Sequence, residues 1–171
     1  MTKYIEAFSW PHSIERFLKE IIKEKPILNV CSGASYFGDV QLERYYFPKD
    51  WYKANGMKVR GDATYLPFRS NSFGAVFSDP PWDAAWKINC KVLCNEAMRI
   101  APVLYLMCPW VWGTNRAPMT NAWVRDMRGM NNAILITRYE RNAEWVLDDN
   151  KDEDVPLQRE VSQIEENGVC Q

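Results

Sequence analysis

Four consecutive residues place an acid, two prolines and an aromatic ring side by side: Asp79, Pro80, Pro81 and Trp82. They follow the apolar segment SFGAVFS, residues 72–78, which predicts a buried strand. Prolines have no amide hydrogen, so two of them cannot continue a strand and instead stiffen the loop after it. A carboxylate can accept hydrogen bonds and a tryptophan can stack on a planar group. The loop is therefore either a turn device or a pre-shaped site.

Residues of similar kinds follow the other segments that predict strands. They are Cys31-Ser32-Gly33 after ILNV, Glu43 after DVQL, Gly61-Asp62-Ala63 after MKVR, and Cys108-Pro109-Trp110 after VLYLM. In open α/β sheets, ligands bind in the crevice at the carboxyl ends of the strands. We therefore expect these residues and the proline loop to line one site.

The spacing of apolar residues predicts an α/β order of elements. Helices are predicted over residues 14–25, with Ser13 as the cap and Pro26 as the stop, and over residues 85–101. Strands are predicted over residues 27–33, 39–42, 57–61, 72–78 and 103–108. Residues 109–130 predict a loop with at most one helix, and residues 132–141 and 143–147 predict a hairpin. The expected fold is a mostly parallel central sheet with an antiparallel C-terminal hairpin strand.

Length and charge predict one domain and a tail. The chain has 171 residues, of which 47% are hydrophobic, enough for a single core. Residues 148–171 carry a net charge of −6, which leaves +5 on residues 1–147. We predict a single domain over residues 1–147 and an acidic, unfolded tail over residues 148–171. The basic domain is compatible with a nucleic-acid partner, but a solvated surface explains its charge equally well.

The cysteines and the hydropathy argue against a disulfide-rich protein, a zinc protein and a membrane or secreted protein. Five scattered cysteines and one histidine, His12, match neither a disulfide framework nor a zinc site, so no metal is predicted. Cys90 and Cys94 share a predicted helix face and are interpreted as packing residues. No uninterrupted apolar run of about 18 residues occurs, and charges interrupt the N-terminal segment where a signal peptide would be apolar. We expect no membrane association and a cytoplasmic location.

Taken together, these segments resemble class I S-adenosylmethionine-dependent methyltransferases, and within them the amino-methyltransferases that carry the motif (D/N/S)PP(Y/F/W). LNVCSGASYFGD, residues 28–39, resembles their cofactor loop. GDATYLPFRSNSFGAVFSDPPW, residues 61–82, resembles their third strand end, fourth strand and motif. The resemblance extends over residues 27–110 and implies a Rossmann-like fold with S-adenosyl-L-methionine as the cofactor.

The resemblance implies cofactor-binding roles at the first and third strand ends. Gly33 would let the backbone approach the methionine part, to which the Cys31 carbonyl and nearby amides would hydrogen-bond, with Ser32 also among the cofactor-binding residues. Asp62 would accept a hydrogen bond from the adenine amino group, and the Ala63 amide would donate to the ring. Read alone, each acid is as well explained as a turn residue; their order along the chain favours the cofactor.

The resemblance also implies roles for the motif. An exocyclic amine on a nucleobase is a poor nucleophile, because its lone pair is delocalised into the ring. The Asp79 carboxylate, which would also border the cofactor, and the Pro80 carbonyl would each accept one N–H of that amine. Pro81 would stiffen the loop, and Trp82 would stack on a base flipped out of its helix or strand.

Two further residues are candidates for substrate binding. Trp110, after the fifth strand, could form another wall of the base pocket, although core packing is the favoured interpretation of this tryptophan. Arg116 lies in the segment 110–130, the natural candidate for target recognition in so short a chain.

The chain departs from the family in its first crossover. Ala34 and Ser35 follow Gly33 where a second glycine is usual, and only about eight residues separate the first two strands, too few for a crossover helix. Either the helix is reduced to a turn and Glu43 is the ribose-binding acid, or residues 36–47 form that helix and the acid lies elsewhere. We favour Glu43, with Asp39 as the alternative.

Three functions remain open from the sequence. The first is an N-methyltransferase acting on a nucleobase amino group, with adenine N6 in DNA preferred. The second is an RNA enzyme acting on a tRNA or rRNA base. The third is a non-catalytic subunit that binds nucleic acid or a partner. The sequence leaves open whether the chain acts alone, as a homodimer or with a partner subunit.

Overall fold

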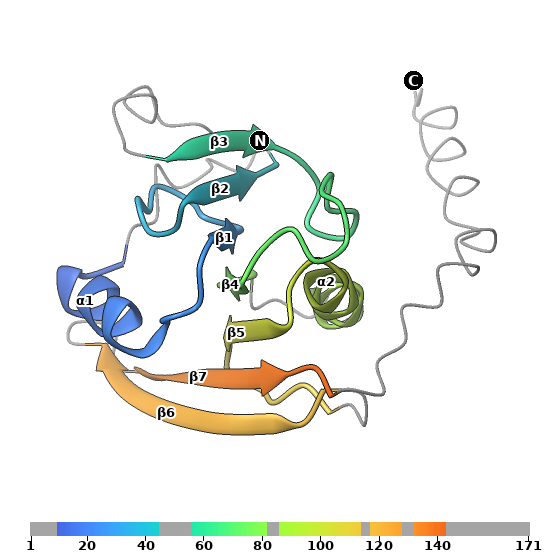
Figure 1. Ribbon diagram of the computed structural model, residues 1–171. Coiled ribbons are helices and arrows are strands. Elements are labelled where there is room, and N and C mark those ends of the chain that lie inside the picture. Colours follow the sequence, from blue (N-terminus) through green and yellow to red (C-terminus); the bar gives the residue numbers. More distant parts are fainter. Residues whose placement is uncertain (1–9, 45–55, 82–85, 114–116, 128–131, 143–171) are drawn as a thin grey trace, which may run out of the picture.

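The structure is a computed structural model that describes residues 10–44, 56–81, 86–113, 117–127 and 132–142. Its elements, in chain order, are α1 His12–Ile21, β1 Ile27–Val30, β2 Val40–Glu43, β3 Met57–Arg60, β4 Ala75–Ser78, α2 Trp86–Ile100, β5 Val103–Met107, β6 Met119–Met127 and β7 Asn132–Glu140 (Figure 1). Every residue of β1, β4 and β5 is buried, as the uninterrupted apolar segments predict for strands covered on both faces.

The strands form one seven-stranded sheet in the order β3-β2-β1-β4-β5-β7-β6. β1 to β5 pair in parallel, whereas β7 runs antiparallel to both β5 and β6. The predicted fold class, a mostly parallel α/β sheet with an antiparallel hairpin at its C-terminal edge, is confirmed.

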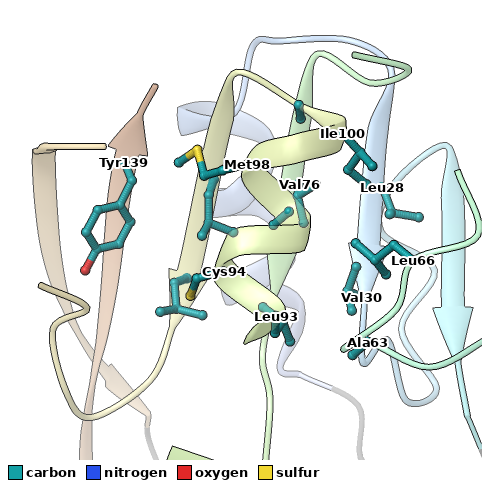
Figure 2. Packing of buried hydrophobic residues seen from close by; sticks show 14 of the residues in the cluster. Leu28, Val30, Ala63, Leu66, Val76, Leu93, Cys94, Met98, Ile100 and Tyr139 are labelled. Carbon is teal, nitrogen blue, oxygen red and sulfur yellow. The ribbon is translucent and has the colours of Figure 1, made fainter. Parts of the chain in front are cut away.

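Two hydrophobic clusters cover the two faces of the sheet, and α1 and α2 lie on opposite sides of it (Figure 1). Strand residues alternate between the faces, so Leu28 and Val76 contact the α2 side while Ile27 and Phe77 contact the α1 side. Figure 2 shows the α2-side cluster, in which Leu93, Cys94 and Met98 of α2 pack over the strands. Cys90 and Cys94 belong to this core, in agreement with their interpretation as packing residues.

The bounds of α1 differ from the prediction at both ends. The helix begins at His12 after Pro11, whose carbonyl accepts the Ile14 amide at 2.9 Å, so Ser13 is not its cap. It ends at Ile21 because Ile22 is already extended, before Pro26 is reached. Glu24 lies beyond this end and pairs with Arg138 of β7 at 3.0 Å. This tertiary contact favours an early end to the helix.

A loop without a helix joins β1 to β2. The loop places Phe37 against Phe77 of β4, with ring centroids 5.6 Å apart, so one side chain fills space that a crossover helix would cover. The buried amides of Asn29 and Gln41 donate to the Phe37 carbonyl at 3.1 and 3.2 Å. Gly38 has φ +94°, and a Cβ there would lie 3.1 Å from the Asn29 Cβ. The alternative of a helix over residues 36–47 is wrong, because residues 40–43 form β2.

The expectation of a loop or one helix over residues 109–130 is wrong for residues 119–127, which form strand β6. β6 is the outer partner in the hairpin with β7, for example through Trp123 opposite Ile136. Thr120, Val124 and Arg125 are exposed, so this edge strand shows no alternating apolar pattern. The other predicted hairpin strand, residues 143–147, and the tail lie outside the described residues.

Among the helices that the structure describes, none combines the length and hydropathy needed to cross a membrane.

Candidate active site at the carboxyl ends of the strands

The sheet reverses its strand order at β1, which lies between β2 and β4. The chain runs outward from β1 to β2 and β3, then returns to the other side of β1 as β4. The loops after β1 and β4 therefore diverge at a topological switch point, where α/β sheets bind ligands. The residues that open these two loops are Cys31 and Asp79.

The loop after β1 has a left-handed backbone at two residues. Cys31 has φ +58° and Gly33 has φ +52°. A non-glycine residue in this region is uncommon and, at strand ends, is often associated with a binding site. The Ser35 amide donates to the Ser32 carbonyl at 2.9 Å and closes the turn. Ser32 is buried, and its Oγ has no hydrogen-bond partner among the described residues.

Glu43 lies at the carboxyl end of β2 and contacts this loop directly. Its Oε2 accepts the Gly33 amide at 3.1 Å, and its Oε1 accepts the Arg44 amide at 2.9 Å. Asp39 lies at the other end of β2, where its carboxylate accepts the Ile27 amide at 2.7 Å. Of the two acids considered for the ribose, Glu43 is the one at the expected edge of the sheet.

Asp62 follows β3 and holds its own turn. Its Oδ1 accepts the amide and the hydroxyl of Thr64 at 2.9 and 2.7 Å, and its Oδ2 pairs with Arg44 at 3.1 Å. Burial raises the pKa of Asp62, but the two hydrogen bonds from Thr64 and the charge of Arg44 outweigh it, so the pKa is lowered. A ligand that used this carboxylate would share it with these partners. Its proposed contact with adenine stays a prediction.

Two side chains of α2 fix the loop that carries Ala63. Glu96 accepts the Leu66 amide at 3.0 Å, and Arg99 donates to the carbonyls of Phe68 and Leu66 at 2.8 and 3.0 Å. Ala63 is 5% exposed and packs in the α2-side cluster (Figure 2). The turn after β3 is thus attached to a helix rather than left to solvent.

Asp79 follows β4, and Trp10 donates a hydrogen bond from its indole Nε1 to the Asp79 Oδ2 at 2.7 Å. Pro80 is buried and Pro81 is exposed. Trp82 and Arg116, which are predicted to contact the substrate, lie outside the described residues. Asp79 and Pro80 therefore lie at the switch point, and the stacking role of Trp82 stays a prediction.

Three strand-end carboxylates affect the pKa of the Cys31 thiol. Cys31 is partly buried and packs against the α2-side cluster. Burial of its thiol is the largest cause of its raised pKa. The charges of Glu43, Asp79 and Asp62 raise the pKa further. Cys31 is therefore a neutral thiol among three strand-end carboxylates.

Cys108 and Trp110 follow β5 at the same edge. The Cys108 thiol donates to the Trp110 carbonyl at 2.9 Å, and its burial, with a further contribution from the Asp79 charge, raises its pKa to about 12. Trp110 is partly buried and packs against the α2-side cluster. Its proposed contact with a base stays a prediction.

The sequence analysis missed the contribution of Trp10. Nothing in the sequence near Trp10 predicts its hydrogen bond to Asp79, 69 residues away. Glu96 and Arg99 were also missed, although their spacing of three residues on a helix predicts an ion pair, which the structure shows at 2.8 Å.

The described residues contain no group of three or more histidine, cysteine, aspartate or glutamate side chains arranged to hold a metal ion. What the edge does offer is acceptors for hydroxyl and amino groups, from Glu43, Asp62 and Asp79, beside the buried Ser32 hydroxyl. This set of groups suits a polar organic ligand with hydrogen-bond donors.

No family model matches the chain, and no curated protein matches it significantly. Solved structures do match. A SAM-dependent methyltransferase from Thermotoga maritima aligns with a TM-score of 0.53 and 11% identity over 75% of this chain and 87% of its own. TrmN from Thermus thermophilus aligns with a TM-score of 0.55 and 12% identity over 76% of this chain and 48% of its own. A proposed RNA methyltransferase from Pyrococcus horikoshii aligns with a TM-score of 0.50 and 13% identity over 75% and 80%. The chain thus has the Rossmann-like fold found in methyltransferases.

Proposed function

We propose that the chain is an S-adenosylmethionine-dependent N-methyltransferase that acts on the exocyclic amino group of a nucleobase. The observation that carries this proposal is the placement of Asp79 and Pro80 directly after β4, beside the Cys31–Gly33 loop at the switch point. In this arrangement an amine acceptor site and a cofactor loop adjoin each other. The fold shared with solved methyltransferases supports the same conclusion.

The described residues fit the cofactor. Glu43 keeps acceptor capacity for ribose hydroxyls, since a carboxylate has about four lone-pair sites and two backbone amides use only two of them. The orphaned Ser32 hydroxyl and the left-handed backbone of Gly33 suit close contact with the methionine part. When bound, S-adenosylmethionine supplies an activated methyl group on a sulfonium ion.

Asp79 and Pro80 would then prepare the amine. The Asp79 carboxylate and the Pro80 carbonyl would each accept one N–H of the amine and favour a tetrahedral nitrogen with a lone pair free for methylation. The nitrogen becomes positive during this step, and the nearby Asp79 carboxylate stabilises that charge. The methylated nitrogen would then lose one proton to solvent. Positioning and electrostatics supply the catalysis, without a covalent intermediate on the protein.

Adenine N6 in DNA is our first choice of target. An RNA base is the second, because one of the structurally similar proteins is described as an RNA methyltransferase. The test offers DNA, RNA and small-molecule pools with labelled cofactor, and digestion to nucleosides followed by mass spectrometry identifies the methylated atom. Methylated adenine from one nucleic-acid pool is the expected product, and label confined to the small-molecule pool would refute the proposal.

Calorimetry with S-adenosylmethionine tests whether the chain is an enzyme or a non-catalytic subunit. The wild-type chain is expected to bind the cofactor, and Asp79→Ala is expected to lose methyl transfer while it retains cofactor affinity within about threefold. If the wild-type chain binds no cofactor, the isolated protein is not an enzyme of this class. Equal loss of transfer and affinity in Asp79→Ala would place Asp79 in cofactor binding alone.

A further inference from the structure

One contact of Asp79 comes from a part of the chain to which the sequence assigns no chemistry. Trp10 directly precedes Pro11 and α1, and its indole Nε1 donates to the Asp79 Oδ2 at 2.7 Å. A hydrogen bond of this length to an ionised acceptor is of the strong, charge-assisted kind. Trp10 is only 5% exposed, so little water competes for the contact.

The Trp10 ring is held by packing on its other sides. It meets Phe77 of β4 edge to face, with centroids 5.1 Å apart and planes at 89°. Phe77 precedes Asp79 by two residues, and both contact Trp10, which belongs to the α1-side cluster. Phe37, from the loop between β1 and β2, contacts the same ring of Phe77. The indole is thus part of the α1-side core, with its single N–H group directed at the carboxylate.

We infer that Trp10 is the positioning residue for Asp79: its N–H fixes the plane of the carboxylate and so the direction of the oxygens that accept the substrate amine. This inference rests on the proposed function. The indole is neutral, so it orients the carboxylate and stabilises its charge without cancelling it. A lysine or arginine donor would instead reduce the negative charge available to the reacting nitrogen.

Two thiols near Asp79 titrate outside the pH range of the test. Cys31 and Cys108 both interact with its charge, and burial, the largest cause, raises the pKa of each thiol. Both thiols therefore stay neutral from pH 5 to pH 8, a range in which ordinary thiols begin to ionise only at the upper end. A change on the acid side of the pH–rate profile then reports on carboxylates rather than on these cysteines.

The experiment compares Trp10→Phe with Trp123→Phe. Both tryptophans pack against the α1-side cluster, and Trp123 contacts the rings of Phe17 and Tyr105. Each change removes the same atoms, but only that at Trp10 removes a hydrogen bond to Asp79. Methyl transfer is measured at saturating cofactor and normalised to folded protein, with cofactor affinity from calorimetry.

For Trp10→Phe we expect kcat to fall about ten- to a hundredfold, the range for a lost hydrogen bond to a charged group, with cofactor affinity within about twofold. The acid limb of kcat should move to higher pH, because the lost donor stabilised the ionised carboxylate. Trp123→Phe should keep kcat within about twofold and leave the acid limb in place. If kcat and the acid limb of Trp10→Phe match those of Trp123→Phe, Trp10 is only a packing residue and the inference fails.

A second measurement needs no variant at Trp10. In protein labelled with ¹⁵N-tryptophan, the assigned Trp10 indole N–H resonance should differ between wild type and Asp79→Asn, and an unchanged resonance would overturn the inference. A wild-type chain without methyl transfer would refute the proposed function. An active wild type with an unaffected Trp10→Phe would refute the role of Trp10 alone.

Discussion

Asp79 and Glu24 are two partly buried carboxylates with different surroundings. Glu24 lies beyond α1, where its Oε1 pairs with Arg138 at 3.0 Å and its Oε2 accepts the Tyr105 hydroxyl at 3.1 Å. Asp79 lies at the switch point and accepts a neutral indole N–H at 2.7 Å. Glu24 is matched by a cation from β7, which joins the end of α1 to the sheet. We therefore expect the ion pair of Glu24 to serve stability and the indole donor of Asp79 to serve the proposed function.

The largest expected effect separates the two carboxylates by activity. Asp79→Asn should lower kcat by about a hundredfold or more and change the melting temperature little, because an amide fills the same space but cannot stabilise a positive nitrogen as a carboxylate does. Glu24→Gln should keep kcat per folded molecule. Methyl transfer and thermal unfolding of both variants, measured side by side, check the comparison; a large loss of kcat in Glu24→Gln would break it.

The next effect concerns stability. Arg138 donates to Glu24, Glu140 and the Tyr105 hydroxyl, and its side chain is 17% exposed. Arg138→Met should lower the free energy of unfolding by about 2 kcal/mol, less than for a fully buried pair, because water partly screens this network. Urea denaturation measures the change. A loss under about 0.5 kcal/mol, typical of surface substitutions, would mean that the network does not stabilise the fold.

A smaller effect contrasts the two ends of β2. Glu43→Gln should weaken S-adenosylmethionine binding about tenfold, through the lost charge of a hydroxyl acceptor. Asp39→Asn removes a similar charge at the opposite end of the strand and should leave cofactor affinity unchanged. Calorimetry of both variants tests this. Equal weakening by the two changes would show that the effect is long-range rather than a contact with the ribose.

The smallest effect is a pH dependence of stability. Burial raises the pKa of Glu24, but hydrogen bonds from its own amide, Arg138 and Tyr105 outweigh it and hold the pKa below the ordinary value of 4.5. A carboxylate whose pKa is depressed by folding stabilises the protein above its unfolded-state pKa, and this contribution is lost as the pH falls through the folded-state value. Wild type should therefore lose more stability than Glu24→Gln between about pH 5 and pH 3. Denaturation curves at several pH values check the difference.

The buried parallel strands were predictable because both of their faces are apolar. The segments around β1, β4 and β5 predict strands by their apolar residues alone, and α2 was predicted to within one residue at each end. β6 was not predictable in the same way. It is an edge strand whose side chains are mostly exposed, so its sequence lacks the apolar pattern of a buried strand. Its backbone pairing with β7 stabilises it instead.

The candidate site was predictable where a residue's position follows from the end of a strand. Glu43, Asp62 and Asp79 occupy such positions. Contacts made across the fold were not predictable: the Trp10 indole on Asp79 and the Arg44 guanidinium on Asp62 depend on tertiary structure that local spacing does not reveal. For the same reason, Asp39 and Glu43 were hard to rank before the bounds of β2 were known.

The helix-free loop between β1 and β2 has a consequence for the order of folding. Leu28 pairs with Val40 of β2, only 12 residues away, whereas Ile27 pairs with Ala75 of β4, 48 residues away. A fourfold difference in loop length corresponds to about 1.2 kcal/mol of closure entropy. The β1–β2 pair should therefore form early in the folding transition state, and the β4 contact, which brings Asp79 beside Cys31, should follow it. Assembly of the site would then follow the pairing of β1 with β2.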